Sequence, residues 1–299
     1  MATKKQDPIL ISVIVPVYNH PEILRETLNS VLRQTYSNIE ILVVDDGSEV
    51  DLYPTIEELN DKRIVYYKLK HTNANVARNY GIQKSNGDFI AMLDADDIWL
   101  NNHLKSCLDL LLKEQADGLY GNLFLRDSAT NQERKFIARA LMENETMIDY
   151  LLSTGCGAQT STLFMTKESA SRVLWDTRLN THQDYDFVIR YSKQFKLVAK
   201  TDPTVIYTMG ADKQQSVDFE SCIQVIRNNE KDITPDIYGN YSLKMLKKAL
   251  SKNASEHIIN HYKKEATFYK EYLSYDQFIH IKNPRSGFEK IRCKLQYVW

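Results

Sequence analysis

Short apolar runs alternate with amphipathic stretches along the first part of the chain. β-Branched and apolar runs are typical of strands buried in a parallel sheet, and apolar residues three and four positions apart are typical of helices. Strands are predicted at residues 9–17, 39–44, 64–68, 89–93 and 118–125. Helices are predicted between them at about 21–32, 54–59, 76–84 and 103–113. This alternation predicts an α/β domain with a mostly parallel sheet and helices on both faces.

The pattern becomes less regular beyond this region. Short strands are predicted at residues 161–165, 196–199 and 205–207, and short helices at 168–174 and 184–193. From about residue 216 onward Gly is scarce, and Lys, Tyr, Leu and Ile recur at helical spacing. The predicted organisation is therefore a flexible tail at 1–8, a main domain at 9–215 and a basic helical region at 216–299. The main domain has two halves, at about 9–125 and 126–215.

Composition narrows the class of protein. The chain of 299 residues has 43% hydrophobic residues, enough for a sizeable core, and a formal net charge of −1, which argues against nucleic-acid binding. The charge is uneven, because residues 241–299 carry +7 and the rest −8. The four cysteines have no zinc-like spacing, so we expect free thiols in a reducing cytoplasm. Without a signal peptide or an apolar span, a soluble or peripheral protein is expected.

Two acidic clusters follow two of the predicted strands. Asp45 and Asp46 precede Gly47 and Ser48, and residues 94–97 read Asp-Ala-Asp-Asp. In an open α/β sheet, ligands bind beyond the carboxyl ends of the strands. Carboxylates gathered at that edge repel one another unless a cation or ligand donors offset their charge. The sequence therefore predicts a site for a divalent metal and a hydroxyl-rich, phosphate-bearing ligand, such as a sugar nucleotide.

Each of these motifs also has a plainer interpretation. Residues 15–19 can be an ordinary strand-to-helix turn, and residues 45–48 an acidic turn that caps the next helix. Arg78 can be a surface arginine, and an isolated Asp-x-Asp is common in proteins. The acidic strand ends support a ligand site more strongly than either motif alone, because they occur together and in order.

Five segments in a fixed order resemble the family-2 glycosyltransferases of bacterial surface-polysaccharide synthesis, which are inverting enzymes with the GT-A fold. The matching segments are residues 13–19, 28–36, 43–48, 77–82 and 87–97. The resemblance is dense over residues 9–115 and looser to about 210. It implies a GT-A α/β fold with a C-terminal helical extension.

The resemblance also implies roles for individual residues. Asp46 would bind the nucleobase, Asp45 would support its loop, and Arg78 would lie near the diphosphate or the acidic cluster. Asp96 would be the principal ligand of Mn2+ or Mg2+, with Asp94 facing the ribose and the metal. The implied donor-binding residues are Pro16, Val17, Tyr18, Asn19, Asp45, Asp46, Arg78, Asp94 and Ala95, and the implied metal ligands are Asp94 and Asp96.

An inverting transfer needs a general base for the acceptor hydroxyl. The family places this acid in a Glu-Asp-aromatic-Asp pattern at a helix start, and residues 183–186 match it except that Gln183 replaces Glu. The resemblance thus implies that Asp184 is the base, and the alternative is a helix N-cap. Asp186 is expected to be structural and paired with Arg190. Because the chain lacks the Gln-x-x-Arg-Trp motif and the membrane helices of processive members, we expect a single addition.

The basic C-terminal region has alternative interpretations. Residues 288–299 are basic, amphipathic and tipped with aromatic residues, which is typical of a segment at an anionic membrane surface. For most of residues 216–299, a helical cap over the main domain or a contact in a homodimer explains the pattern.

The sequence therefore predicts a metal-dependent, inverting glycosyltransferase that uses Mn2+ or Mg2+. It would move one hexose or N-acetylhexosamine from a UDP-sugar to a glycan hydroxyl. By analogy with the family, the acceptor is a polyprenyl-diphosphate-linked oligosaccharide for O-antigen or capsule synthesis, at the cytoplasmic face of the inner membrane. One alternative is a non-catalytic nucleotide-sugar or glycan-binding protein. The other, a sugar-1-phosphate nucleotidyltransferase, would need a Gly-rich loop after the first strand, which residues 15–21 lack.

Overall fold

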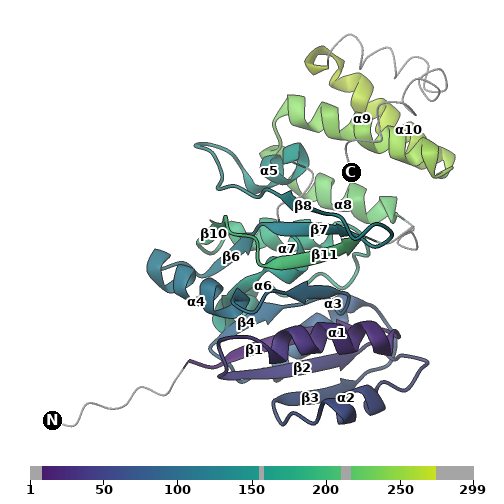
Figure 1. Ribbon diagram of the computed structural model, residues 1–299. Helices are drawn as coiled ribbons and strands as arrows, with labels where there is room; N and C mark the ends of the chain where they lie inside the picture. Colours follow the sequence, from purple (N-terminus) through teal and green to yellow (C-terminus); the bar gives the residue numbers. More distant parts are fainter. Residues whose placement is uncertain (1–8, 155–157, 210–216, 274–299) are drawn as a thin grey trace. The chain divides into compact units, whose positions relative to one another are not determined.

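The structure is a computed structural model that describes residues 9–154, 158–209 and 217–273. It contains two compact units (Figure 1). The first comprises Met1–Met142 and Cys156–Val217, and the second comprises Glu143–Gly155 and Asp218–Trp299. The second unit therefore includes a segment from within the predicted main domain, which the sequence pattern did not indicate.

A seven-stranded sheet forms the centre of the first unit, in the order β10-β6-β9-β4-β1-β2-β3. Its strands are β1 (Ile11–Val17), β2 (Ile39–Asp45), β3 (Ile64–Lys68), β4 (Phe89–Met92), β6 (Gly118–Gly121), β9 (Phe164–Thr166) and β10 (Leu197–Lys200). β9 runs antiparallel to β4 and β6, and the other neighbours are parallel. The predicted mostly parallel sheet is confirmed. The strand predicted at 161–165 starts later, because residues Thr160–Thr162 form a 3-10 turn.

A smaller sheet has the order β5-β11-β7-β8. It contains β5 (Asp97–Trp99), β7 (Leu123–Asp127), β8 (Glu133–Phe136) and β11 (Val205–Met209). The single strand predicted at 118–125 is wrong, since the chain passes from β6 in the large sheet to β7 in the small one at Asn122. The Asn122 side chain fixes this crossing by donating to the carbonyl of Thr201 and accepting from the N–H of Ala138.

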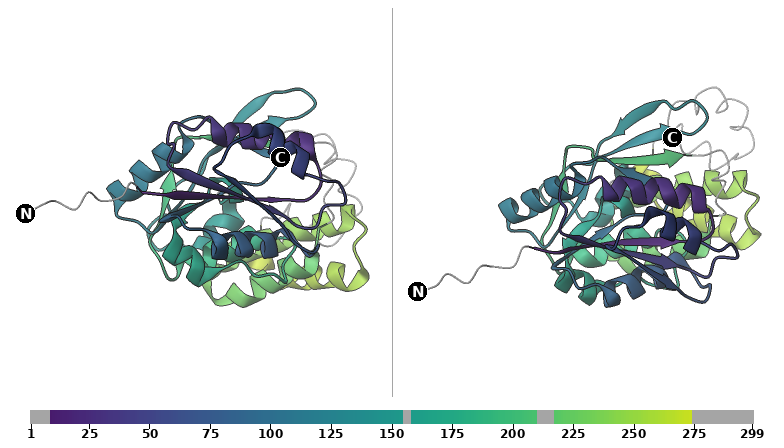
Figure 2. Two further views of the ribbon diagram at one scale, coloured as in Figure 1. Left: turned by 90° about the horizontal axis from the view of Figure 1, so that it is seen from below. Right: turned by 60° about the horizontal axis from the view of Figure 1, so that its bottom comes forward.

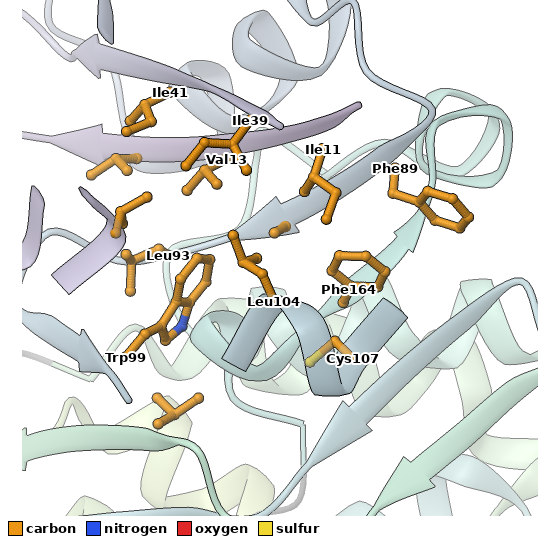
Figure 3. Packing of buried hydrophobic residues seen from close by; sticks show 14 of the residues in the cluster. Ile11, Val13, Ile39, Ile41, Phe89, Leu93, Trp99, Leu104, Cys107 and Phe164 are labelled. Carbon is orange, nitrogen blue, oxygen red and sulfur yellow. The ribbon is translucent and has the colours of Figure 1, made fainter. Parts of the chain in front are cut away.

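Helices cover both faces of the large sheet (Figure 2). α1 (Pro21–Leu32), α2 (Tyr53–Leu59) and α4 (His103–Glu114) belong to one face, and α3 (Ala74–Lys84), α6 (Lys167–Val173) and α7 (Gln183–Ser192) to the other. Alternate side chains of β1 pack against the helices on the two faces of the sheet. Ile11 and Val13 pack in one core with Leu104 and Cys107 of α4 (Figure 3), whereas Ile14 faces Gly81 of α3. A Cβ on Gly81 would lie 2.5 Å from Ile14, so α3 can pack this closely only with glycine there.

The second unit is helical over its described residues. It contains α5 (Met147–Thr154), α8 (Phe219–Asn229), α9 (Pro235–Ser251) and α10 (Glu256–Phe268), with 3-10 turns at Glu230–Asp232 and Lys270–Tyr272. α9 packs against α5 and α10, and the carboxylate of Asp149 on α5 accepts from the N–H of Thr234 at the start of α9. The predicted helical extension is confirmed for these residues, and the segment at 288–299 lies outside them. Within the described part of the chain, no helix has the length and apolarity needed to cross a bilayer.

Candidate donor and acceptor site

The carboxyl end of β1 begins the site. Pro16 and Val17 are paired with Val44 and Asp45 of β2, so β1 ends at Val17, the predicted end of the first strand. Beyond β1, Asn19 adopts a left-handed conformation with φ of 58° and leads the chain toward α1. The Asn19 N–H donates to the hydroxyl of Ser48 at 2.7 Å, and its side-chain oxygen accepts from the N–H of Glu49 at 3.0 Å. The loops after β1 and β2 are therefore joined.

Asp45 is fully buried at the end of β2 and holds its loop. Its carboxylate accepts from both the N–H and the hydroxyl of Ser48, at 2.7 and 2.6 Å. The other oxygen accepts from the phenol of Tyr66 at 2.6 Å. Burial and this carboxylate raise the pKa of Tyr66, which keeps the phenol protonated as a donor. These contacts support the fold of the loop directly.

Asp46 lies in a corner with two aromatic side chains. It is 3% exposed, and its carboxylate accepts from the N–H of Thr72 at 2.9 Å and lies 3.0 Å from Nδ1 of His71. The His71 ring stacks on Tyr18, with ring centroids 4.3 Å apart, and Tyr18 is 39% exposed. Gly47 has a φ of 77°, and a Cβ there would lie 2.4 Å from the backbone of His71. The sequence predicted Tyr18 and Asp46 but not His71, which belongs to no motif in the chain.

Arg78, on α3, joins the second acidic cluster to its surroundings. The side chain is buried, and its guanidinium donates to Asp94 at 2.7 Å and to the side-chain oxygen of Asn75 at 2.8 Å. The guanidinium carbon also lies 4.6 Å from the ring centre of Trp175, a distance typical of a cation–π contact. Arg78 is therefore not a surface arginine, and that interpretation of the sequence is wrong.

In the turn at residues 94–97, Asp94 and Asp96 are partly exposed and Asp97 is buried. Thr27 of α1 donates to the carbonyls of Ala95 and Asp97, at 2.9 and 3.0 Å, and so fixes the turn from below. Asp97 is 1% exposed and accepts from the hydroxyl of Ser161 at 2.5 Å. Asp94, Ala95 and Asp96 are only partly buried. The turn therefore presents Asp94 and Asp96 at the edge of the sheet.

The donor set at this turn suits a hard divalent cation, because carboxylate oxygens are the ligands that such ions prefer. Among residues 9–154, 158–209 and 217–273, no three His, Cys, Asp or Glu side chains gather as a complete metal cage. Two carboxylates at one turn instead fit the type of Mg2+ site in which the protein supplies one or two ligands and substrate phosphates and water supply the rest. Asp94 and Asp96 fit that arrangement by residue type and position.

Asp184 is the second residue of α7. The cap position before the helix is held by His182, with φ of 60° and no side-chain cap, so the N-cap interpretation of Asp184 is wrong. The partly buried carboxylate accepts from the N–H of Tyr185 at 2.9 Å. The net effect of the surroundings is to raise the pKa of Asp184 to about 6: burial is the main cause, the Tyr185 bond and the charge of Arg78 lower the pKa, and the charge of Asp94 adds a smaller rise. The fold thus brings Asp184 within electrostatic reach of the Arg78–Asp94 pair.

Asp186 has the structural contact predicted for it. Its carboxylate accepts from Nε of Arg190 at 2.8 Å, one turn along α7. The same guanidinium donates to the carbonyls of Val173 and Leu174, at 2.6 and 2.8 Å. The predicted Asp186–Arg190 pair is confirmed, and it fixes α7 to the end of α6.

Asn73, the N-cap of α3, and Asn75 and Asn79 within it hold the segment that leads to α7, and the sequence reasoning gave them no role. Asn73 donates to the carbonyl of Thr177, and Asn79 exchanges hydrogen bonds with the backbone of Trp175. Asn75 donates to the carbonyls of Asp176 and Leu179. One feature of the sequence could have indicated their role. Asn recurs in and just before this helix although it has low helix propensity.

Known proteins with similar sequences agree with this architecture. Residues 12–175 match the family described as "Glycosyl transferase family 2". The amylovoran biosynthesis glycosyltransferase AmsB of Erwinia amylovora is 33% identical in an alignment of 214 residues that covers 67% of this chain and 70% of AmsB. The UDP-Glc:alpha-D-GlcNAc-diphosphoundecaprenol beta-1,3-glucosyltransferase WfgD of Escherichia coli is 38% identical over 117 residues, or 39% of this chain and 46% of WfgD.

A solved structure shows the same fold. S. aureus TarS superposes with a TM-score of 0.66 at 16% identity, over 90% of this chain and 50% of that chain. The large sheet with its strand-end cluster of acidic residues is that of a GT-A glycosyltransferase, which confirms the predicted fold class. The chain belongs to glycosyl transferase family 2, and its relatives include enzymes of surface-polysaccharide synthesis, as the resemblance predicted.

Proposed function

We propose that this glycosyltransferase moves one hexose or N-acetylhexosamine from a UDP-sugar to a glycan hydroxyl, with inversion at the anomeric carbon. The observation that carries the proposal is the Asp184 carboxyl at the start of α7, which feels the charges of both Arg78 and Asp94 and has a pKa of about 6. A carboxyl group with this pKa is mostly ionised at pH 7 and still binds a proton better than an ordinary aspartate, as a general base requires.

The donor would bind along the carboxyl ends of β1, β2 and β4. Asp46 would accept an N–H of the uracil, and the exposed face of Tyr18 offers a surface on which the base can stack. Arg78 supplies the positive charge for the diphosphate, held in place by Asn75 and Asp94. The name of the relative WfgD, a UDP-Glc-dependent enzyme, supports UDP as the nucleotide.

Asp94 and Asp96 would hold Mn2+ or Mg2+ at the turn after β4. A bound divalent cation would neutralise the negative charge on a departing diphosphate. The positive charge of Arg78 on α3 would also stabilise the negative charge on the departing diphosphate. Its buried guanidinium is held in place by Asn75 and Asp94. Thr27 and Ser161 keep the turn in place from two other elements.

The transfer would be a direct displacement. Asp184 accepts the proton of the acceptor hydroxyl while the hydroxyl oxygen bonds to the anomeric carbon. The bond from that carbon to the diphosphate oxygen breaks on the opposite side, and UDP leaves with the electron pair. One displacement inverts the anomeric configuration, and a single base suffices for it.

The acceptor would be a polyprenyl-diphosphate-linked oligosaccharide at the cytoplasmic face of the inner membrane. The relative WfgD is named for an acceptor on diphosphoundecaprenol, which supports this class. In the second unit, a shallow hollow on α10 is lined by Asn260, Lys263, Lys264, Thr267 and Phe268. Phe268 is 75% exposed, and basic residues beside an exposed aromatic ring suit an anionic membrane surface.

The test is release of UDP in the presence of Mn2+ from UDP-Glc, UDP-Gal, UDP-GlcNAc and UDP-GalNAc. We expect metal-dependent release from one donor, lost in Asp96→Ala and Asp184→Asn. Asp186→Asn, on the same helix, is the matched control and should keep activity where it remains folded. UDP binding by calorimetry without turnover of any donor, with a lipid-linked acceptor analogue present, would favour the non-catalytic binding protein. Absence of UDP binding would overturn the assignment.

A further inference from the structure

Asn75 is a buried polar residue of α3 whose side chain contacts both halves of the site. Its side chain is 2% exposed, and its amide bonds both to Arg78 on the same helix and to the segment that follows α6. The oxygen accepts from Arg78 at 2.8 Å, and the amide nitrogen donates to the carbonyls of Asp176 and Leu179, at 3.0 and 2.8 Å. A buried amide that satisfies three partners at once fixes their relative positions.

Arg78 depends on this amide for its orientation. One end of its guanidinium binds Asn75 and the other binds Asp94, while the plane lies against Trp175. The described contacts include two hydrogen bonds that orient the Arg78 guanidinium. If Asn75 is truncated, only the one to Asp94 remains among them. A guanidinium held by both ends is pre-organised, whereas one held by a single end can rotate.

The main-chain partners of Asn75 lie in the segment that leads from α6 to α7. Asp176 and Leu179 precede His182, whose left-handed conformation turns the chain into the helix that carries Asp184. The groups that act on the Asp184 carboxylate are Arg78 of α3, Asp94 after β4 and the N–H of Tyr185 on α7 itself. Asn75 therefore touches the donor-side pair on one side and the support of the acceptor-side base on the other.

We propose that Asn75 is a positioning residue that holds Arg78 against Asp94 and fixes the segment leading to the base Asp184, and so keeps the two halves of the site in register. This inference rests on the proposed function for its catalytic consequence. It makes a structural prediction that needs no substrate, namely that the Arg78 guanidinium is rotationally fixed in wild type and released when Asn75 is truncated.

The experiment compares Asn75→Ala with Asn122→Ala in the full chain. Asn122 is also buried, at 9% exposure, and its side chain also bridges two main-chain groups, but its partners Thr201 and Ala138 are not residues of the site. Side-chain NMR of 15N-arginine, with Arg78 assigned from Arg78→Lys, reports guanidinium rotation. We expect separate terminal nitrogen signals for Arg78 in wild type and Asn122→Ala, and averaged signals in Asn75→Ala.

Activity supplies the second measurement. We expect kcat to fall on the order of 100-fold in Asn75→Ala, as for misplacement of a reacting group by about 1 Å. The acid limb of its pH profile should move to higher pH, because the Tyr185 bond and the charge of Arg78 both lower the pKa of Asp184 and a displaced Arg78 would lower it less. Asn122→Ala should lower stability without moving that limb. If Asn75→Ala does not fold, Asn75→Ser keeps a polar atom and serves the same comparison.

Fixed Arg78 signals in the folded Asn75 variant, with an unchanged pH profile, would overturn the inference. Averaging of these signals in Asn122→Ala as well would also overturn it, since general loosening would then explain the effect. A wild-type protein that turns over no donor would contradict the proposed function instead. The NMR comparison would still decide the role of Asn75 in that case.

Discussion

Replacing Asp184 by Asn should stabilise the protein at neutral pH while it removes the base. Burial raises the pKa of this carboxyl from an ordinary 3.8 to about 6 in the folded protein. The folded state therefore binds the proton more tightly than the unfolded state. The protonated Asp184 makes its full contribution to the free energy of unfolding below about pH 4. This contribution is lost as the pH rises through about 6.

The size of this effect follows from the shift. Each pKa unit corresponds to about 1.4 kcal/mol, so ionised Asp184 lowers the free energy of unfolding by about 3 kcal/mol at pH 7 and above. This is an upper limit, because the side chain is only partly buried and solvent screens part of its charge. Asn has the shape of the protonated acid and can still accept from the N–H of Tyr185. The variant should thus match wild type near pH 4 and exceed it at pH 7.

The assay is urea unfolding between pH 4 and pH 8, followed by the fluorescence of Trp99 and Trp175, which are both buried in the first unit. Asp186→Asn is the matched control on the same helix. It should lower the free energy of unfolding at pH 7, because Asp186 is paired with Arg190. A stability difference between Asp184→Asn and wild type that stays constant with pH, or has the opposite sign at pH 7, would refute the reasoning.

Three further predictions concern ligands and membranes. Tyr18→Ala should raise the Kd for UDP about 10-fold or more in calorimetry, because base stacking on an aromatic ring is lost, and Tyr53→Ala, another exposed tyrosine, should not. Asp96→Ala should abolish the stimulation of UDP release by Mn2+. If Mn2+ stimulates this variant as much as wild type, Asp96 is not a ligand of the metal. Lys263→Glu and Lys264→Glu should each weaken sedimentation with phosphatidylglycerol vesicles about fivefold or more, and equal binding by both variants would contradict membrane contact through α10.

The large sheet was predictable because its signals are local. Residues 41–44 of β2 are a continuous run of Ile, Leu and Val that is followed by Asp45, and such a run is recognisable without its neighbours. The small sheet was not predictable in this way. β8 consists mainly of exposed charged residues, and it is a strand because its backbone pairs with β7. That pairing depends on the turn between them and not on apolar periodicity.

The grouping of α5 with the C-terminal helices shows a similar limit. Nearly every side chain of this short helix is buried, so the sequence has no polar face to reveal its period. Its partner α9 begins 81 positions after the end of α5. The contact between Asp149 and Thr234 is specific, but neither residue carries a signal for the other.

In the site, the sequence indicated the charged residues better than their supports. Asp94 and Arg78 belong to motifs with fixed spacing, and the structure brings them to 2.7 Å. His71, Asn75 and Trp175 stand outside such motifs or have plainer interpretations, and their roles follow from contacts across the fold. Burial of Asp184, which sets its pKa, likewise depends on the packing of α7 and not on neighbouring residues.

The most direct test of the proposed mechanism is the anomeric configuration of the transferred sugar. The donor that supports UDP release would be incubated with a synthetic alpha-D-GlcNAc-diphosphate-lipid acceptor, and the new linkage would be read by 1H NMR during the first turnovers. Direct displacement with Asp184 as base predicts a β-linked product from an α-linked UDP-sugar, and no product with Asp184→Asn. An α-linked product, or unchanged transfer by that variant, would contradict the account.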